Sequence, residues 1–313
     1  MCQQTRVDTA NPYSERFMKR FPTVKALARA DEDAVLAMWS GLGYYRRARL
    51  LHRGAREVIS TYAGTIPRDA DERLSLPGIG RYTAGAIGSI AFHQEEPIVD
   101  GNVMRVLSRV YGIRTPLGRR DTEKAFWEKA TELVRGERPG DFNQSLMELG
   151  ALVCAPTSPR CETCPVRRSC VAYKDGLVAK LPVVAAKKAP AVVDLVAVVA
   201  HARADKNSAW YVRSEKALFG GLWNLPMSEG HGRKSATKAL RDAGLKGRLV
   251  SKSETLLTHV LSHRRMRVEV WTAVSERMRE SATRKYVSVK ERSSLGVSRL
   301  TAKVLSHTGH EVE

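Results

Sequence analysis

Apolar side chains recur at three- and four-residue intervals over the first half of the chain, and this spacing predicts a series of amphipathic helices. Residues 12–21 show it first, with Pro12 near the expected beginning of the helix. Asp31 is a plausible N-cap for the next helix. The clearest pattern spans residues 48–62, where one face holds Ala48, Leu51, Ala55, Val58, Ile59 and Tyr62. Because apolar and polar side chains do not alternate with period 2 anywhere in this half, we expect an all-α domain up to about residue 153.

The pattern changes beyond residues 181–191, a stretch that has a proline near each end and is typical of a linker. The elements predicted after it are strands over 194–200, 210–213, 254–261 and 265–274 and helices over 235–242 and 297–305. Strands mixed with two helices predict an α+β domain over residues 192–313.

Four of the five cysteines, Cys154, Cys161, Cys164 and Cys170, follow the spacing C-x6-C-x2-C-x5-C. Four thiolates in so short a stretch can surround one metal centre, and both zinc and iron–sulfur clusters accept four cysteines. Zinc sites usually carry two C-x2-C pairs, whereas one pair has that spacing here, so we favour an iron–sulfur cluster. A disulfide framework is the alternative, but the cysteines are few and no secretory leader is recognised. Cys2 is assigned no function.

The charge balance adds a second signal. The chain has 313 residues, and 52 Lys and Arg against 33 Asp and Glu give a formal charge of +19 and a pI near 10.0. Such a field favours a polyanionic partner, nucleic acid first, although a generally basic proteome is an alternative explanation. A composition of 43% hydrophobic and 27% charged residues is typical of globular proteins, and no apolar run is long enough for a membrane span. We therefore expect an intracellular protein that does not enter membranes.

Residues 69–92 predict two helices joined by the turn Leu76-Pro77-Gly78-Ile79-Gly80. Two glycines around one aliphatic residue allow a sharp turn and direct backbone N–H groups from a helix N-terminus, an arrangement that suits a DNA phosphate. This resembles a helix–hairpin–helix motif, which holds the DNA backbone without reading sequence. A simple turn between helices is the alternative. The basic composition of the chain favours phosphate binding.

Asp100 precedes another helical pattern, and taken alone it would only cap that helix. The order of the features changes this interpretation. A helix–hairpin–helix, an aspartate just beyond it and the four-cysteine loop resemble the base-excision DNA glycosylases that carry a [4Fe-4S] cluster. Tyr82 occupies the position at which the members with lyase activity carry a lysine. The resemblance therefore implies a monofunctional enzyme.

Several local matches resemble the adenine DNA glycosylases of the MutY type, which remove adenine mispaired with 8-oxoguanine or guanine. These matches are Gln3-Gln4-Thr5, residues 41–45, residues 76–87 and Asp100-Gly101-Asn102-Val103. The resemblance implies that Asp100 stabilises the oxocarbenium side, that Asn102 holds nearby backbone or water, and that Tyr82 orients the acid or lines the pocket. The DNA-binding residues that it implies are Gln3, Gln4, Tyr44, Gly78, Gly80, Arg81, Ser262 and His263.

The stretch 218–226 resembles the nudix-like C-terminal domain of the same family. The helix after it lacks the clustered glutamates that a nudix hydrolase needs for its metal, so we expect a domain that reads the lesion. A Phe-Ser-His turn contacts 8-oxoguanine in the family, and Leu261, Ser262 and His263 match it here. The resemblance thus implies four segments: a helical glycosylase domain over 1–153, an iron–sulfur loop over 154–180, a linker over 181–191 and the nudix-like domain over 192–313.

In the family, the general-acid glutamate lies two residues ahead of the position matched by Met1. We therefore expect an N-terminally truncated sequence. As it stands, it would bind damaged DNA but cleave adenine poorly or not at all, because loss of a general acid lowers the rate by about 10²–10⁴-fold. Two alternatives stay open: a non-catalytic protein that binds lesions, and an endonuclease III-like enzyme for oxidised pyrimidines. The expected partner is double-stranded DNA with adenine opposite 8-oxoguanine or guanine. We further expect a monomer in a bacterial-type cytoplasm, associated with the nucleoid.

Overall fold

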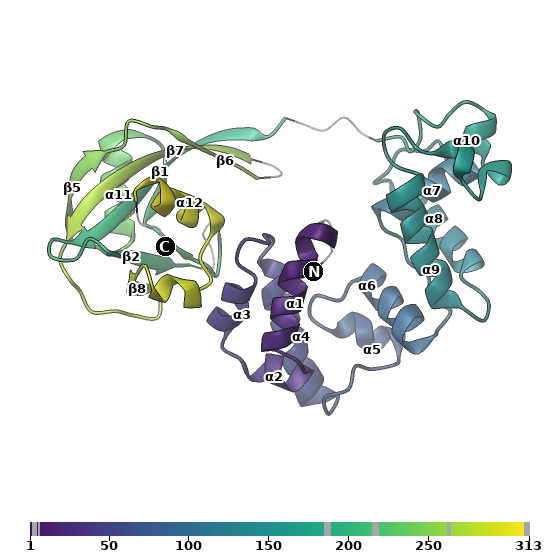
Figure 1. Cartoon of the computed structure of the whole chain (residues 1–313), viewed down its shortest axis with the longest axis horizontal. Coiled ribbons are helices and arrows are strands. Elements are labelled where there is room, and N and C mark those ends of the chain that lie inside the picture. Colours follow the sequence, from purple (N-terminus) through teal and green to yellow (C-terminus); the bar gives the residue numbers. More distant parts are fainter. Residues whose placement is uncertain (2–4, 6, 185–188, 215–218, 262–263, 310–313) are drawn as a thin grey trace. The chain divides into compact units, whose positions relative to one another are not determined.

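The computed structural model describes residues 1, 5, 7–184, 189–214, 219–261 and 264–309, and these form two compact units. The first unit contains both ends of the chain, Met1–Arg56 and Lys188–Glu313, and the second contains Glu57–Lys187. Figure 1 labels their elements. The sequence divides the chain by pattern and resemblance into residues 1–153, 154–180, 181–191 and 192–313. The two units are defined by packing, so this division stays a prediction. No described helix has both the length and the apolar character of a membrane span.

The first part of the first unit consists of α1 (Val7–Arg20), α2 (Val24–Arg29), α3 (Glu32–Met38) and most of α4 (Arg46–Thr61), whose last five residues belong to the second unit. The expected helix over 12–21 begins earlier, so Pro12 lies inside α1 and not at its beginning. Asp31 is the N-cap residue of α3, but its side chain makes no capping hydrogen bond. The core of these helices is apolar and includes one residue from much later in the chain. Its buried members are Phe17, Phe21, Leu27, Val35, Leu36, Trp39, Leu42, Ala48, Ala55 and Leu222.

The rest of the first unit is the α+β domain that the sequence predicts. Its larger sheet has the order β4-β1-β7-β5, with β6 also paired to β7, and its smaller sheet has the order β3-β2-β8. The strands are β1 (Ala191–Ala202), β2 (Ser208–Arg213), β3 (Trp223–Asn224), β4 (Met227–Glu229), β5 (Gly247–Lys252), β6 (Leu257–Val260), β7 (Arg264–Ser275) and β8 (Arg284–Ser288). The helices are α11 (Gly232–Asp242), η5 (Glu291–Ser294) and α12 (Arg299–His307).

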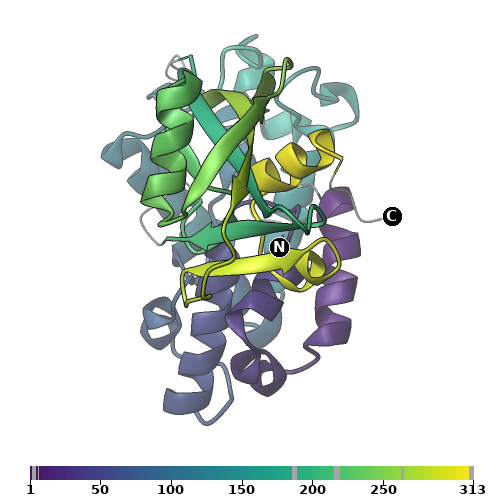
Figure 2. The ribbon, with the colours of Figure 1, turned by 90° about the vertical axis from the view of Figure 1, so that its left-hand side faces the viewer.

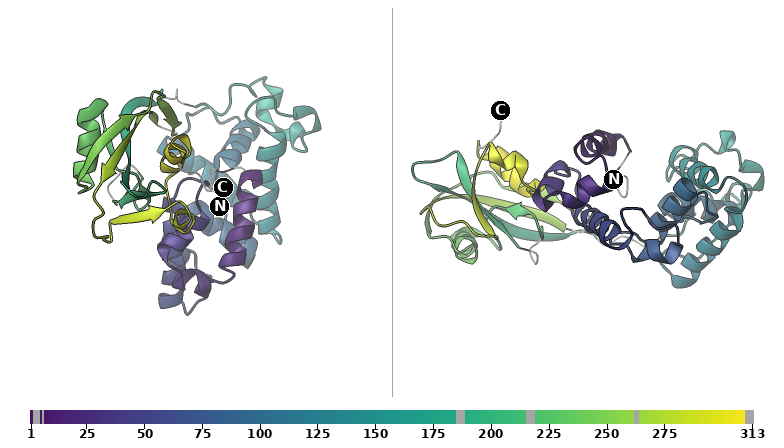
Figure 3. Two further views of the ribbon diagram at one scale, coloured as in Figure 1. Left: turned by 60° about the vertical axis from the view of Figure 1, so that its left-hand side comes forward. Right: turned by 90° about the horizontal axis from the view of Figure 1, so that it is seen from below.

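Most of β1 is buried, so the side chains on both of its faces are covered, and this explains its almost continuous apolar sequence. Val196 and Val198 pack toward α11, whereas Leu195 and Ala197 pack in the core shared with the smaller sheet and α12. The two helices therefore lie on opposite sides of the larger sheet (Figure 2; Figure 3, left). β1 and β7 run parallel over twelve paired positions. Sequence periodicity located both strands and did not reveal their pairing.

The second unit is helical, as expected. Its elements are α5 (Ala70–Ser75), α6 (Arg81–Ala86), the π-helical turn η1 (Ile87–Ala91), α7 (Gly101–Tyr111), α8 (Arg120–Leu133), α9 (Pro139–Glu148), the π-helical turn η2 (Leu149–Val153), η3 (Cys161–Thr163), η4 (Arg167–Ser169) and α10 (Val171–Lys174). α7 is the central helix of its core, contributing Val103, Val106 and Leu107, which pack with Phe126 of α8 and Leu146 of α9.

Candidate active site and cysteine loop

The hairpin between α5 and α6 has the sharp turn that its glycines predict. Gly78 has φ +85°, a conformation that side chains with a Cβ rarely adopt. Gly80 is the N-cap residue of α6, and an added Cβ there would meet no atom within 4 Å, so the backbone is open to an approaching group. The Arg81 guanidinium lies over the Trp127 ring, 3.8 Å from its centroid. The structure thus places Gly78, Gly80 and Arg81 together at the beginning of α6.

Asp100 is the N-cap residue of α7, so the capping role expected for this position is present. Its Oδ1 accepts a hydrogen bond from the Val103 backbone N–H at 2.7 Å, and its Oδ2 accepts one from Asn102 Nδ2 at 3.2 Å. Capping and the Asn102 bond hold the carboxylate in one orientation while the side chain remains partly exposed. The structure therefore brings Asp100 and Asn102 together, with Asn102 bonded to the carboxylate itself, whereas the resemblance implied that it holds nearby backbone or water.

Arg105 extends this arrangement along α7. Its Nη2 donates to Asn102 Oδ1 at 2.9 Å and to the Gly150 carbonyl at 2.7 Å, and its Nε donates to the Cys154 carbonyl at 2.7 Å. Burial is the largest cause lowering the pKa of Arg105, but a guanidinium remains a cation in proteins. Hydrogen bonds therefore connect the Asp100 carboxylate, through Asn102 and Arg105, to the beginning of the cysteine loop.

Tyr82 lies on the first turn of α6 and is half-buried against the core of the second unit. Its hydroxyl donates to the Met147 sulfur at 3.2 Å. Ile98 and Val99, which lead into Asp100, belong to the same core. Tyr82 thus belongs to the apolar core from which the segment leading into Asp100 extends, and its predicted pocket-lining role stays a prediction.

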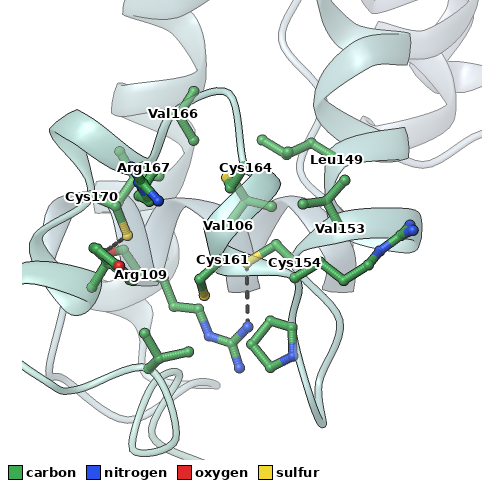
Figure 4. A pocket seen from close by; sticks show the side chains of 15 residues that line it. Val106, Arg109, Leu149, Val153, Cys154, Cys161, Cys164, Val166, Arg167 and Cys170 are labelled. Carbon is green, nitrogen blue, oxygen red and sulfur yellow. Dashed lines mark hydrogen bonds between the residues drawn. The ribbon is translucent and has the colours of Figure 1, made fainter.

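The four cysteines form no disulfide in the described part of the chain. They line one cavity, shown in Figure 4. Arg109, which is 3% exposed, lies beside it: its Nη1 donates to Cys154 Sγ at 3.3 Å, and Cys170 Sγ donates to its backbone carbonyl at 3.4 Å. Burial is the largest cause that raises the pKa of the Cys161 thiol, followed by the neighbouring Cys154.

The donor chemistry of this cavity suits a cluster of soft metal ions, since four thiols face it beside one buried cation. Apolar side chains complete its walls: Val106, Val110, Leu149, Val153, Val166 and Val178. Within the described ranges, no three His, Cys, Asp or Glu side chains form a group that could hold a metal ion. The residues present thus fit a thiolate-bound group in their type and in lining one cavity, although their side chains are not arranged as a metal site.

Three arginines of the cysteine loop, Arg160, Arg167 and Arg168, carry charge that would suit DNA phosphates. Arg167 is paired with Glu162 at 2.6 Å, and Arg160 donates to the Leu152 carbonyl. Arg168 is exposed. Phosphate contact by Arg160 or Arg167 would therefore compete with a contact within the loop, which the sequence did not indicate.

Other predicted DNA-binding residues belong to the first unit or lie outside the described residues. Tyr44 belongs to the first unit, is 49% exposed and has φ +49°, with the Arg47 guanidinium 5.3 Å from its ring centroid. Gln3, Gln4, Ser262 and His263 lie outside the described residues. The flanks of the last two show the expected hairpin, because the Leu261 N–H donates to the Arg264 carbonyl at 2.8 Å.

Comparison with known proteins identifies the helical portion. Residues 1–132 match the model of the HhH-GPD superfamily base excision DNA repair protein. A solved structure of a thermostable thymine-DNA glycosylase is 30% identical, with a TM-score of 0.50, and the match covers 55% of this chain and 80% of that one. Residues 1–132 belong to the HhH-GPD superfamily. The hairpin and the aspartate beyond it are therefore those of a base excision repair fold.

Within the HhH-GPD superfamily, the chain is similar to adenine DNA glycosylases. The Schizosaccharomyces pombe enzyme is 46% identical over 56% of this chain and 38% of its own length, and that of Rattus norvegicus is 49% identical over 56% and 34%. That of Buchnera aphidicola subsp. Acyrthosiphon pisum is 36% identical over 72% and 64%. The match thus spans between about a third and two thirds of these relatives, and it confirms the predicted resemblance to the MutY type.

Sequence reasoning missed the residues that support the site. Arg105 and Arg109 are one helical turn apart on α7, and both donate to the backbone at Cys154 or just after it. The i, i+4 spacing of the two arginines, of which the first comes three residues after Asn102, is the sequence signal that could have indicated their shared role. Asn143 of α9 is a further buried polar residue, and nothing in its local sequence distinguishes it.

Proposed function

We propose that this chain acts as an adenine DNA glycosylase that hydrolyses the N-glycosidic bond of adenine paired with 8-oxoguanine or guanine, without lyase activity. The observation that carries the proposal is the fixed Asp100 carboxylate at the beginning of α7, held by the Val103 N–H and the Asn102 amide. The similarity to adenine DNA glycosylases supports adenine as the substrate base.

The chemistry requires a flipped base and a carboxylate beneath the sugar. Adenine cannot be cleaved inside the stack, so it must be turned out into a pocket. As the bond to the base breaks, positive charge develops on the sugar, and a nearby fixed carboxylate stabilises that charge before water attacks. Asp100 would supply this carboxylate. Asn102 would keep its orientation, and Tyr82 would line the pocket.

Double-stranded DNA is the proposed partner. The open turn at Gly78 and Gly80 directs the beginning of α6 outward, which suits a backbone phosphate, and the formal charge of +19 supports the attraction. Tyr44, Gln3 and Gln4 would contact bases near the lesion. Ser262 and His263, between β6 and β7, would contact 8-oxoguanine. Mispair selectivity therefore rests on residues of the first unit.

The proposed cofactor is a [4Fe-4S] cluster held by Cys154, Cys161, Cys164 and Cys170. Their shared cavity supports this assignment, together with the free state of all four thiols. Bound there, the cluster would order the loop by cross-linking its turns. Arg109 would contribute a buried positive charge beside the thiolates.

The test is a single-turnover assay of adenine release from a duplex with an 8-oxoguanine:adenine pair. It is run on the 313-residue chain and on the longest in-frame product of its gene. Asp100→Asn keeps an N-cap side chain and removes the charge, and we expect the rate to fall by about 10²–10³-fold.

Asp69→Asn is the matched control, because Asp69 caps α5 by accepting from the Asp71 and Glu72 N–H groups. It should leave the rate within a factor of about two. Equal losses in the two variants would mean that Asp100 acts only as a cap. Borohydride trapping on abasic DNA should yield no covalent adduct, and an adduct would overturn the monofunctional assignment.

A further inference from the structure

A buried polar network joins the second helix of the hairpin to the segment that leads into Asp100. Asn143 of α9 is 1% exposed, and its Nδ2 donates both to Ser89 Oγ at 2.8 Å and to the Glu96 carbonyl at 2.9 Å. Ser89 is fully buried in η1, and its hydroxyl donates to the Gly85 carbonyl at 2.7 Å. One amide group thus holds two segments that adjoin the proposed DNA-binding and catalytic residues.

Close glycine contacts show how tightly these segments meet. A Cβ added at Gly85 would lie 2.2 Å from the Pro97 carbonyl oxygen, and one at Gly88 would lie 2.5 Å from the Glu96 carboxylate. A Cβ at Gly140, on the same helix as Asn143, would lie 2.7 Å from the Ser89 carbonyl oxygen. The backbone of residues 96–98, the helix that begins at the hairpin, and α9 are therefore in direct contact.

Whereas Asn143 bonds the backbone of Glu96, the Glu96 side chain is held by an arginine of the hairpin. It forms an ion pair with the fully buried Arg73 of α5, the first helix of the hairpin, and Arg73 also donates to the Pro67 carbonyl at 3.2 Å. Both helices of the hairpin are thus tied to Glu96, four residues before Asp100. The fully buried Ile98 anchors the residues between them.

We propose that Asn143 is a positioning residue that keeps the segment ending at Asp100 in register with the hairpin. This inference rests on the proposed function. When the hairpin holds a DNA phosphate, the Asn143 bonds set the place of the Asp100 carboxylate relative to that phosphate, and hence to the flipped nucleotide. A buried apolar residue could fill the same space, but it could not hold a hydroxyl and a carbonyl on two different segments.

The test compares Asn143→Ala, which removes both bonds, with the milder Ser89→Ala, which removes the bond to η1. The control is Ser108→Ala, because Ser108 is 1% exposed, lies near the far end of α7 and donates to the Ile113 carbonyl at 3.0 Å. The readouts are the single-turnover rate of adenine release at saturating enzyme, the burst amplitude with substrate in excess, and the Kd for an abasic product duplex. The burst amplitude reports the fraction of enzyme that is folded and active, whereas the single-turnover rate reports the activity of each folded molecule.

We expect the rate to fall by about 10–100-fold in Asn143→Ala and by a smaller factor in Ser89→Ala, with Kd within about twofold, because a small misplacement of a catalytic group is costly. Ser108→Ala should keep the wild-type rate. The Ser89→Ala variant preserves the test if Asn143→Ala does not fold. Reduced amplitude with an unchanged rate in both variants would show a merely structural role and overturn the inference. Absence of release by the wild-type gene product would instead overturn the proposed function, and this inference with it.

Discussion

Arg105 Nε donates a hydrogen bond to the Cys154 carbonyl at 2.7 Å, although the two residues are 49 positions apart in the sequence. The same guanidinium reaches Asn102, the neighbour of Asp100. The orientation of the proposed catalytic carboxylate and the first turn of the cysteine loop therefore depend on one side chain.

Replacing Arg105 by lysine should weaken both ends of this connection. Lysine keeps the charge but lacks the planar fork, so the carbonyl groups of Gly150 and Cys154 would lose at least one donor. We expect the free energy of unfolding to fall by about 1–3 kcal/mol and adenine release to slow. Urea denaturation and the single-turnover assay measure the two effects. Arg114→Lys, at a side chain 68% exposed, is the control and should change neither.

Asp33 of α3 should stabilise the first unit through its charge. Its Oδ1 accepts from Arg213 Nη1 at 2.7 Å and from Trp223 Nε1 at 3.2 Å, and Lys285 Nζ lies 3.7 Å from its Oδ2. Asp33→Asn retains an acceptor and removes the charge, so we expect a loss of about 1–3 kcal/mol in unfolding free energy.

Ionic strength provides the check on that interpretation. The difference between wild type and Asp33→Asn should shrink in 1 M salt (Debye length about 3 Å), because salt screens partly exposed charges. Asp194→Asn serves as the comparison, since Asp194 pairs with Arg267 at a more exposed position and should matter less. A difference that does not change with salt would point to packing at Trp223 and not to the charge.

His52 of α4 should make the first unit sensitive to acid. The side chain is fully buried, and burial, followed by the nearby Arg56, lowers its pKa below the usual value. The folded state therefore favours the neutral ring. The contribution of His52 is complete above the unfolded pKa of about 6.5 and is lost as the pH falls through the lower folded value.

Urea denaturation at several pH values between about 7.5 and 5 tests this sign. Burial and then Lys303 lower the pKa of His259 in β6, so this residue also makes the protein less stable as the pH falls. Wild type and the His52 variant must therefore both retain His259. As the pH falls, the unfolding free energy of wild type should decrease more than that of His52→Leu. A pH-independent difference for His52→Leu would contradict the prediction.

The metal content of the purified protein should distinguish the two kinds of four-cysteine site. We expect iron and acid-labile sulfide in wild type and in Cys2→Ser, and their loss in Cys161→Ser, because a cluster requires all four thiolates. Elemental analysis and a sulfide assay give the answer directly. Zinc without sulfide would establish the alternative that the single C-x2-C pair led us to disfavour.

Local patterns predicted much of this molecule. Helical periodicity found α4 and α7, and the glycines around Ile79 located the hairpin, because turn and helix signals reside in neighbouring residues. The parallel pairing of β1 with β7 was missed, since period-2 patterns say nothing about partners. β5 and β8 were missed as well, and both are short and largely exposed or half-buried. In the site, Asp100 and the cysteines were readable, whereas Arg109 and Asn143 act through contacts across 45 or more residues.

The burial of Leu222 among α1–α4 has a consequence for how the chain is made. The helices at the beginning of the chain are synthesised first, yet their core is completed by a residue that leaves the ribosome about two hundred positions later. β1 must likewise wait for β7 before its parallel ladder can form. Non-local pairing of this kind slows folding and leaves apolar surface exposed in the meantime. During synthesis, the Glu57–Lys187 unit therefore has the opportunity to fold before the unit that contains the N-terminus.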